Sequence, residues 1–210
     1  MTGERKHYFW LAATTALVAA VPLLTDNDFH LRVLFLVGVN FWNFFGAGVF
    51  GLIINLPIAN YYEHGTYLTV NHGHAALMGV YGNLSIGALL FCCRYLGAPE
   101  RWNEQLTRTV FWSLNVGLLL MVIMDLFPAG VHQLFAAMDQ GLWFARSQGF
   151  LQSPAFQTMT WLRIVGGSIF LLGGVIPLAW FVLTHIRHLK PAGLPVEETV
   201  KEPEEEMVMN

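Results

Sequence analysis

The sequence has little charge, and its charged residues do not gather into a patch that a polyanion could bind. Only 12% of the 210 residues are Asp, Glu, Lys or Arg, and the formal net charge is −3. No basic cluster is interleaved with aromatic residues, so nucleic acid is not expected as a partner. Cysteine is also scarce: Cys92 and Cys93 are adjacent, cannot easily pair with each other and do not have the spacing of a zinc site. We interpret them as small residues of a helix.

Long apolar runs take the place of charge. Hydrophobic residues make up 55% of the chain and aromatic residues 14%, and the mean hydropathy is +0.50. This composition predicts an all-α integral membrane protein with about five transmembrane helices in one membrane domain, residues 1–189. The expected helices cover residues of about 8–24, 33–56, 72–93, 109–127 and 161–185.

The last residues, 190–210, differ in composition from the rest. They are rich in Pro, Glu, Val and Lys and have no apolar periodicity, so we expect a disordered acidic tail. Lys and Arg near the span ends number six on the side of this tail and four on the other. The six are Arg32, Arg94, Arg101, Arg108, Arg187 and Lys190, and the four are Arg5, Lys6, Arg146 and Arg163. By the positive-inside rule the C-terminus is cytoplasmic, and a multi-pass protein of the bacterial inner membrane is expected.

The second apolar run contains a letter-for-letter match to the dinucleotide-binding pattern G-x-G-x-x-G at residues 46–51. That pattern binds a dinucleotide only when it follows a strand in a soluble βαβ unit. Here it lies inside a membrane run, where small residues let a neighbouring helix or a flat cofactor approach closely. We therefore predict a packing surface. Asn40 and Asn43, in the same run, are expected to form hydrogen bonds between helices.

Two connections carry polar residues of interest. Ala59–Val70 is expected to be a short polar and aromatic link in which Glu63 and His64 are solvated at the interface. Pro128 is expected to bend the chain out of the fourth span into an amphipathic stretch through Ala145. Asp125, near the end of that span, is a candidate for a proton or water site, and the roles of His64 and His132 are left open.

The most informative stretch is His72-Gly73-His74, at the start of the third span. Two residues at i and i+2 of a helix lie about 200° apart around its axis. The two imidazoles therefore cannot bind one ion together, but each could hold a separate cofactor on its own flank. Ionisable side chains at membrane depth usually mark function, and imidazole is a common axial ligand of haem iron. The alternative is a pair of histidines that reach toward the membrane interface.

The stretch from Asn55-Leu56-Pro57 through Tyr61-Tyr62-Glu63-His64-Gly65-Thr66 to His72-Gly73-His74-Ala75-Ala76 resembles the large subunit of bacterial nitric oxide reductases. These enzymes belong to the haem-copper oxidase superfamily, and the resemblance covers residues of about 43–163. It implies the C-terminal portion of a twelve-helix fold, which would make this chain alone an incomplete enzyme. It also implies reduction of two NO by two electrons and two protons to N2O and water.

The resemblance assigns roles to the histidines. It makes His72 the proximal ligand of a high-spin haem b and His74 an axial ligand of a low-spin haem b. A non-haem iron completes the family's active site, with ligands expected outside this chain. Arg146 and Arg163 are candidates for binding the haem propionates, because a guanidinium pairs with a carboxylate through two parallel hydrogen bonds. Ordinary anchoring at the membrane interface is the alternative for both.

The implied partners are membrane lipid, the remaining N-terminal helices, NO as substrate, and either quinol or cytochrome c as electron donor. Two other functions remain open. One is a haem-copper oxygen reductase of the cytochrome oxidase type. The other is a non-catalytic protein, either a haem-b membrane protein or a small transporter with polar residues at membrane depth.

Overall fold

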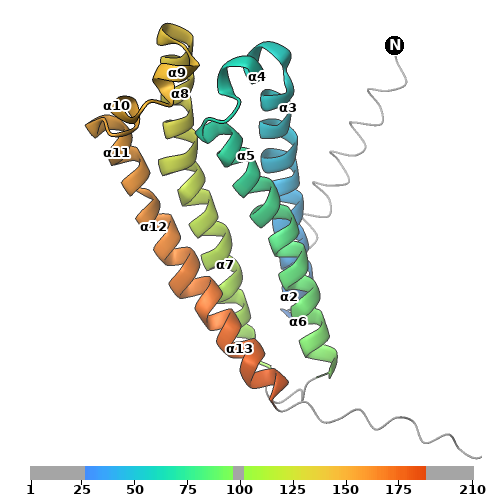
Figure 1. Ribbon diagram of the computed structural model, residues 1–210. Coiled ribbons are helices and arrows are strands. Elements are labelled where there is room, and N and C mark those ends of the chain that lie inside the picture. Colours follow the sequence, from blue (N-terminus) through green and yellow to red (C-terminus); the bar gives the residue numbers. More distant parts are fainter. Residues whose placement is uncertain (1–26, 97–101, 188–210) are drawn as a thin grey trace, which may run out of the picture.

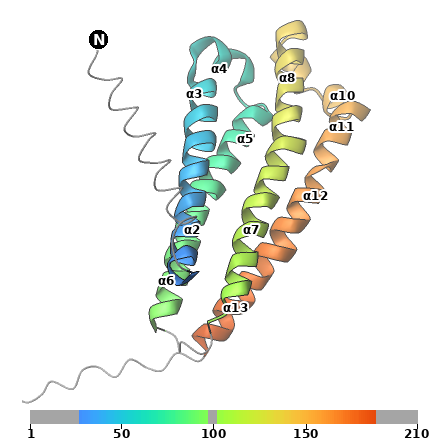
Figure 2. The ribbon, with the colours of Figure 1, turned by 180° about the vertical axis from the view of Figure 1, so that it is seen from behind.

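The computed structural model describes residues 27–96 and 102–187, and all of these form helices and short connections. Four long helical rods run side by side (Figures 1 and 2). Each rod is apolar and long enough to cross a membrane: Val33–Asn55, Tyr67–Arg94, Glu104–Gln140 and Pro154–Ile186. Within the described residues the structure thus has four of the five expected spans. The first expected span, residues 8–24, and the expected tail, residues 190–210, lie outside them.

Every rod consists of α-helix interrupted by a π-helical segment. The first comprises α2 (Asn27–Trp42), η2 (Asn43–Val49) and α3 (Phe50–Asn55), and the second α5 (Tyr67–Ala76), η3 (Leu77–Gly82) and α6 (Asn83–Leu96). The third comprises α7 (Glu104–Met121), η5 (Val122–Leu126) and α8 (Phe127–Gln140). The fourth comprises α11 (Pro154–Trp161), α12 (Arg163–Ser168), η6 (Ile169–Val175) and α13 (Ile176–Ile186). Short helices α4 (Pro57–Glu63), α9 (Leu142–Ala145) and α10 (Gln148–Leu151) connect the rods at one end.

The second, third and fourth rods are longer than the expected spans, and the third exceeds its expected span most. The fourth expected span ends at about residue 127, but the helix continues through Pro128 to Gln140. The expected bend at Pro128 is wrong. Pro128 follows closely after the π-helical segment η5 within a continuous helix, so its missing N–H falls where the regular α-helical hydrogen bonds are already interrupted.

Glycine allows the third and fourth rods to approach closely. A Cβ atom on Gly117 of α7 would lie 2.7 Å from the backbone nitrogen of Phe170, and one on Gly166 would lie 2.6 Å from the carbonyl oxygen of Gly117. Neither position can hold a larger residue without a shift of backbone. Small residues at these positions thus form a packing surface between the two rods.

A buried amide network joins the first three rods. Asn115 of α7 and Asn83 of α6 exchange hydrogen bonds of 3.0 Å, and Trp42 Nε1 donates to Asn115 Oδ1 at 2.8 Å. The cross-helix role expected for Asn40 and Asn43 is wrong: Asn40 donates to Leu36 O within its own helix, and Asn43 is exposed. Sequence alone does not tell which asparagine faces a neighbouring helix.

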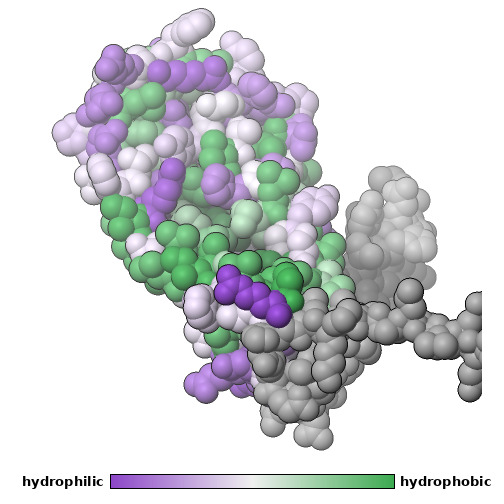
Figure 3. Space-filling view, turned by 60° about the horizontal axis from the view of Figure 1, so that its bottom comes forward, coloured by the Kyte–Doolittle hydropathy of each residue, from purple (hydrophilic) through white to green (hydrophobic). Residues whose placement is uncertain are grey.

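The surface of the bundle is apolar, as a lipid-facing surface should be. Large hydrophobic side chains are exposed on all four rods, for example Leu52, Leu77, Ile123 and Leu172. Hydrophobic residues gather over the body of the bundle and hydrophilic ones toward the end that carries the short helices (Figure 3). The chain is a multi-pass membrane protein.

Candidate functional site

His72 lies on α5 and turns toward the first rod. Its Nδ1 is 2.8 Å from the carbonyl oxygen of Gly46. A carbonyl only accepts, so Nδ1 carries the proton and donates it. The ring edge also packs on Gly51, where a Cβ atom would lie 3.1 Å from His72 Cε1. Nε2 is therefore the ring nitrogen whose lone pair remains for a metal, and the ring is held in one orientation.

The π-helical segment η2 helps to supply this partner. In an α-helix the N–H of Phe50 would donate to the carbonyl of Gly46. In this helix it donates to Phe45 O instead. The Gly46 carbonyl is thus available to His72. The prediction that residues 46–51 form a packing surface is confirmed, because a Cβ atom on Gly46 would lie 2.7 Å from the backbone of Ala75.

His74 leaves the same helix on a different side. Its Nδ1 is 3.0 Å from Val70 O, one turn back along α5, and its side chain is exposed. Here too the carbonyl requires the proton on Nδ1 and leaves Nε2 as the ligand atom. His72 thus faces the first rod, whereas the exposed His74 side chain bonds back to its own helix.

Arg163 belongs to a partly buried ion pair. Its Nε donates to Asp125 Oδ2 at 2.6 Å, and Asp125 is completely buried, whereas the Arg163 side chain is 44% exposed. The guanidinium also lies over the ring of Tyr67, with Cζ 5.6 Å from the ring centre. Asp125 therefore fixes one edge of a guanidinium whose remaining surface is accessible from outside the bundle.

Arg146 contacts the chain just before α5. Its Nη2 donates to the carbonyl oxygen of His64, and a Cβ atom on Gly65 would lie 3.0 Å from the same nitrogen. Gly65 has a φ of 71°, in the left-handed region that favours glycine. Arg146 and Arg163 thus reach the N-terminal end of α5, whereas His72 and His74 lie in the second half of that helix, about one and a half to two turns further on.

Glu63 is not solvated, contrary to expectation. It is 1% exposed, and its carbonyl, not its carboxylate, accepts from Thr66 and Thr69. Burial raises the pKa of the Glu63 carboxyl above its ordinary value of 4.5. Among the described residues, Glu63 Oε1, Asp125 Oδ1 and both amide atoms of Asn71 are buried without a hydrogen-bond partner.

Three other polar residues take structural positions. His132 stacks on Phe150 with ring centres 5.1 Å apart, and Asp139 is exposed at the end of α8. His185, which sequence reasoning did not single out, is buried and bonds through Nε2 to Cys93 O at 3.0 Å. This contact joins residues 92 positions apart, and no local pattern signals it.

The histidines fit the axial ligation of haem. A haem iron takes at most one protein ligand on each side, and His72 and His74 each present a single oriented imidazole with Nε2 as the ligand atom. Across residues 27–96 and 102–187 no three His, Cys, Asp or Glu side chains come together as a metal site. The donor set of the described residues therefore suits one ligand for each of two metals.

Comparisons with known proteins identify relatives of most of the chain. The family model described as "Cytochrome C and Quinol oxidase polypeptide I" matches residues 5–169. A nitric oxide reductase subunit of Stutzerimonas stutzeri is 27% identical over 213 residues, covering 85% of this chain and 43% of that protein. A bacteroid cytochrome c oxidase subunit 1 homolog of Bradyrhizobium diazoefficiens is 30% identical over 148 residues, 63% of this chain and 25% of that protein. Cytochrome c oxidase subunit 1 of Rhodobacter capsulatus is 28% identical, over 73% of this chain and 29% of that protein. The chain thus spans less than half the length of each.

Proposed function

Because the chain belongs to the cytochrome c and quinol oxidase polypeptide I family of haem-copper oxidases, we propose that it is part of a respiratory nitric oxide reductase. In this role His72 holds a high-spin haem b and His74 holds a low-spin haem b. The observation that carries the proposal is the pair of oriented imidazoles that leave one helix on different sides. The similarity to the nitric oxide reductase of Stutzerimonas stutzeri favours NO as the substrate.

When bound, the two haems and a non-haem iron supply the electron transfer and the N–O chemistry. The chain's own residues orient the ligands. The Gly46 carbonyl holds the His72 ring, and the Val70 carbonyl holds the His74 ring, so neither ring has to be ordered when iron binds. Both ligands lie within three consecutive residues, so one turn of helix would hold both haems.

The two arginines are proposed to bind the haem propionates at the N-terminal end of α5. A propionate is a carboxylate, and Arg163 presents a guanidinium that Asp125 already fixes in place. The ligands of the non-haem iron, the second ligand of the low-spin haem and the electron donor, quinol or cytochrome c, would come from partners of this chain. The bacterial inner membrane, with the C-terminus in the cytoplasm, is the proposed location.

Haem titration of the purified chain tests the proposal. We expect weak haem binding, seen as a Soret band, that falls by about half in His72→Ala and in His74→Ala and is lost in the double variant. His132→Ala is the matched control, because the His132 ring stacks on Phe150 and has no proposed ligand role, and it should bind haem as the parent chain does. Unchanged binding in the folded double variant would rule out both ligand roles.

An oxygen reductase is the second candidate, favoured by the cytochrome c oxidase subunits among the relatives. The chain assembled with its remaining helices should consume NO rather than O2 with a reduced donor. Consumption of O2 alone would select the oxygen reductase and leave the two haem-ligand roles intact. Consumption of NO by the isolated 210-residue chain would show that the additional helices are dispensable, contrary to the proposal.

A further inference from the structure

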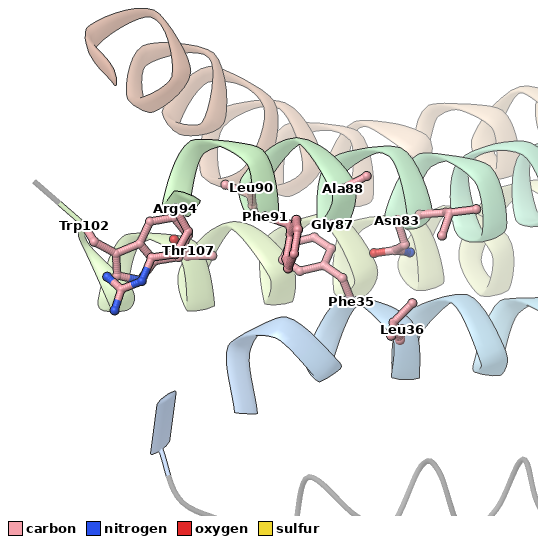
Figure 4. Close-up of a pocket in the computed structure, with 11 residues that line it drawn as sticks. Phe35, Leu36, Asn83, Gly87, Ala88, Leu90, Phe91, Arg94, Trp102 and Thr107 are labelled. Atoms are coloured by element: carbon pink, nitrogen blue, oxygen red, sulfur yellow. The ribbon is translucent and has the colours of Figure 1, made fainter. Parts of the chain in front are cut away.

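A narrow apolar groove runs between α2 and α6 (Figure 4), and neither His72 nor His74 lines it. Its volume is about 250 Å³, and its walls include Phe35 and Leu36 from α2 and Leu84 and Ala88 from α6. The residues that line it follow α6 from Asn83 to Arg94, so the groove runs along the helix axes (Figure 4). In a membrane protein this direction leads from the bilayer centre to its surface.

The length of the groove matches one leaflet. The eleven steps from Asn83 to Arg94 correspond to about 16 Å of helix at 1.5 Å per residue. Half of a hydrocarbon core is about 15 Å. Arg94 ends the span Tyr67–Arg94, so the groove begins at a membrane surface and ends near the midplane.

The shape of the groove suits an extended chain. Its volume of about 250 Å³ is drawn out along about 16 Å of helix, so the groove is long and narrow. A whole helix with its side chains is about 10–12 Å across and does not fit inside it. A single extended hydrocarbon chain does.

The mouth of the groove has the chemistry of a phospholipid headgroup site. Arg94 lies over the ring of Trp102, with Cζ 5.2 Å from the ring centre, and both residues line the groove. Tryptophan is typical of the level of lipid headgroups, and a guanidinium binds phosphate oxygens through paired N–H groups. A cation at one end of a one-leaflet apolar slot is complementary to a lipid with an anionic headgroup.

We propose that this groove binds one acyl chain of an anionic phospholipid, whose phosphate lies at Arg94. The site is independent of the haem ligands. It gives the chain a preference for anionic lipid in the leaflet that contains Arg94, which the positive-inside rule makes the cytoplasmic one.

Lipid retention tests the site. The full 210-residue chain is purified from vesicles of equal parts dioleoyl phosphatidylglycerol and dioleoyl phosphatidylcholine, and retained lipid is counted by native mass spectrometry. We expect retained phosphatidylglycerol to exceed phosphatidylcholine. Arg94→Gln should weaken retention about fivefold, since one arginine near an anionic surface contributes about 1 kcal/mol. Ala88→Phe should plug the groove and abolish it.

Two matched variants serve as controls. Arg187→Gln removes an exposed arginine at the same end of the bundle, and Ala179→Phe adds a phenyl ring on α13, outside the groove. Both should retain lipid as the parent chain does, and circular dichroism should show unchanged helix content in all four. Equal retention by all four variants, or equal retention of the two lipids, would overturn the proposal.

A photo-crosslinker at position 88 identifies the occupant directly. An adduct with lipid supports the proposal. An adduct with residues 8–24, an adduct with a second copy of the chain, or no adduct would overturn it.

Discussion

Replacing Arg163 with alanine should destabilise the bundle more than any loss of a surface ion pair. The change would leave the carboxylate of Asp125 completely buried without its cation. Removing one partner of a buried pair typically costs about 3–5 kcal/mol. A stranded carboxylate can instead take up a proton, and from the ordinary aspartate pKa of about 3.9 this costs about 4 kcal/mol at pH 7. We therefore expect a loss of about 3–4 kcal/mol at pH 7. At pH 5 the cost of protonating the Asp125 carboxylate falls to about 1.5 kcal/mol, and the expected loss of stability falls with it.

Removing the carboxylate instead of the guanidinium should destabilise the bundle less. Asp125→Ala leaves Arg163 without its carboxylate, but that side chain is 44% exposed and can be solvated. The double variant should be more stable than Arg163→Ala alone, because removing both partners leaves no buried charge. Arg108→Ala is the control: Arg108 and Glu104 form an exposed pair at 3.0 Å, which contributes about 0–1 kcal/mol.

Unfolding in mixed micelles with increasing dodecyl sulfate, followed by tryptophan fluorescence at pH 7 and pH 5, measures these differences. If Arg163→Ala lost no more stability than Arg108→Ala, or lost the same amount at both pH values, the ion pair would not have the role assigned here.

Three further outcomes can be checked. Burial raises the pKa of the Glu63 carboxyl above 4.5, so the folded state favours the protonated form. The stability that this protonated carboxyl gives is present below pH 4.5 and is lost as the pH rises through the raised pKa. Glu63→Gln should therefore melt at a higher temperature than the parent chain at pH 7 but not at pH 4. Gly46→Ala should cost about 1–3 kcal/mol because its Cβ atom would meet the backbone of Ala75 at 2.7 Å, whereas Gly73→Ala, with nothing within 4 Å, should be neutral or stabilising in the same unfolding assay. A reporter fused after Lys190 should be active in the cytoplasm and one inserted at Gly141 on the opposite side; the reverse would show that the six-to-four count of Lys and Arg misled the orientation.

The apolar runs predict the rods well because membrane burial requires length and hydrophobicity and little else. The ends of the rods are less predictable, since polar caps extend a helix beyond its apolar part. Asn103 accepts from the N–H of Leu106 and Ser153 from that of Phe156, so the third and fourth rods start at Glu104 and Pro154, before the expected residues 109 and 161. A proline at position 128 suggests the end of a helix, but the residues before it form a π-helical segment instead.

The sequence likewise predicts one part of the candidate site and not another. That His72 and His74 leave α5 on different sides follows from about 100° of rotation per residue and needs no knowledge of the fold. That Arg163 pairs with Asp125 does not, because the two residues lie on different rods, 38 positions apart. Asp125 is conspicuous in the sequence as a carboxylate inside an apolar run, yet the run alone does not show which cation approaches it.

The orientation of His72 depends on a feature that residue patterns do not report. Its hydrogen-bond partner is a backbone carbonyl, so the residue type at position 46 matters only through the space that glycine leaves for Ala75. An α-helical geometry at this point would direct the Phe50 N–H to that carbonyl, whereas the π-helical segment directs it to Phe45 O. π-Helical segments are rare in proteins, and those that occur often lie at functional sites. The π-helical turn of the first rod thus leaves a backbone carbonyl available, and this carbonyl fixes the tautomer of the His72 imidazole on the second rod. A substitution that restored regular α-helix around Gly46 would be expected to loosen the His72 ring without touching it.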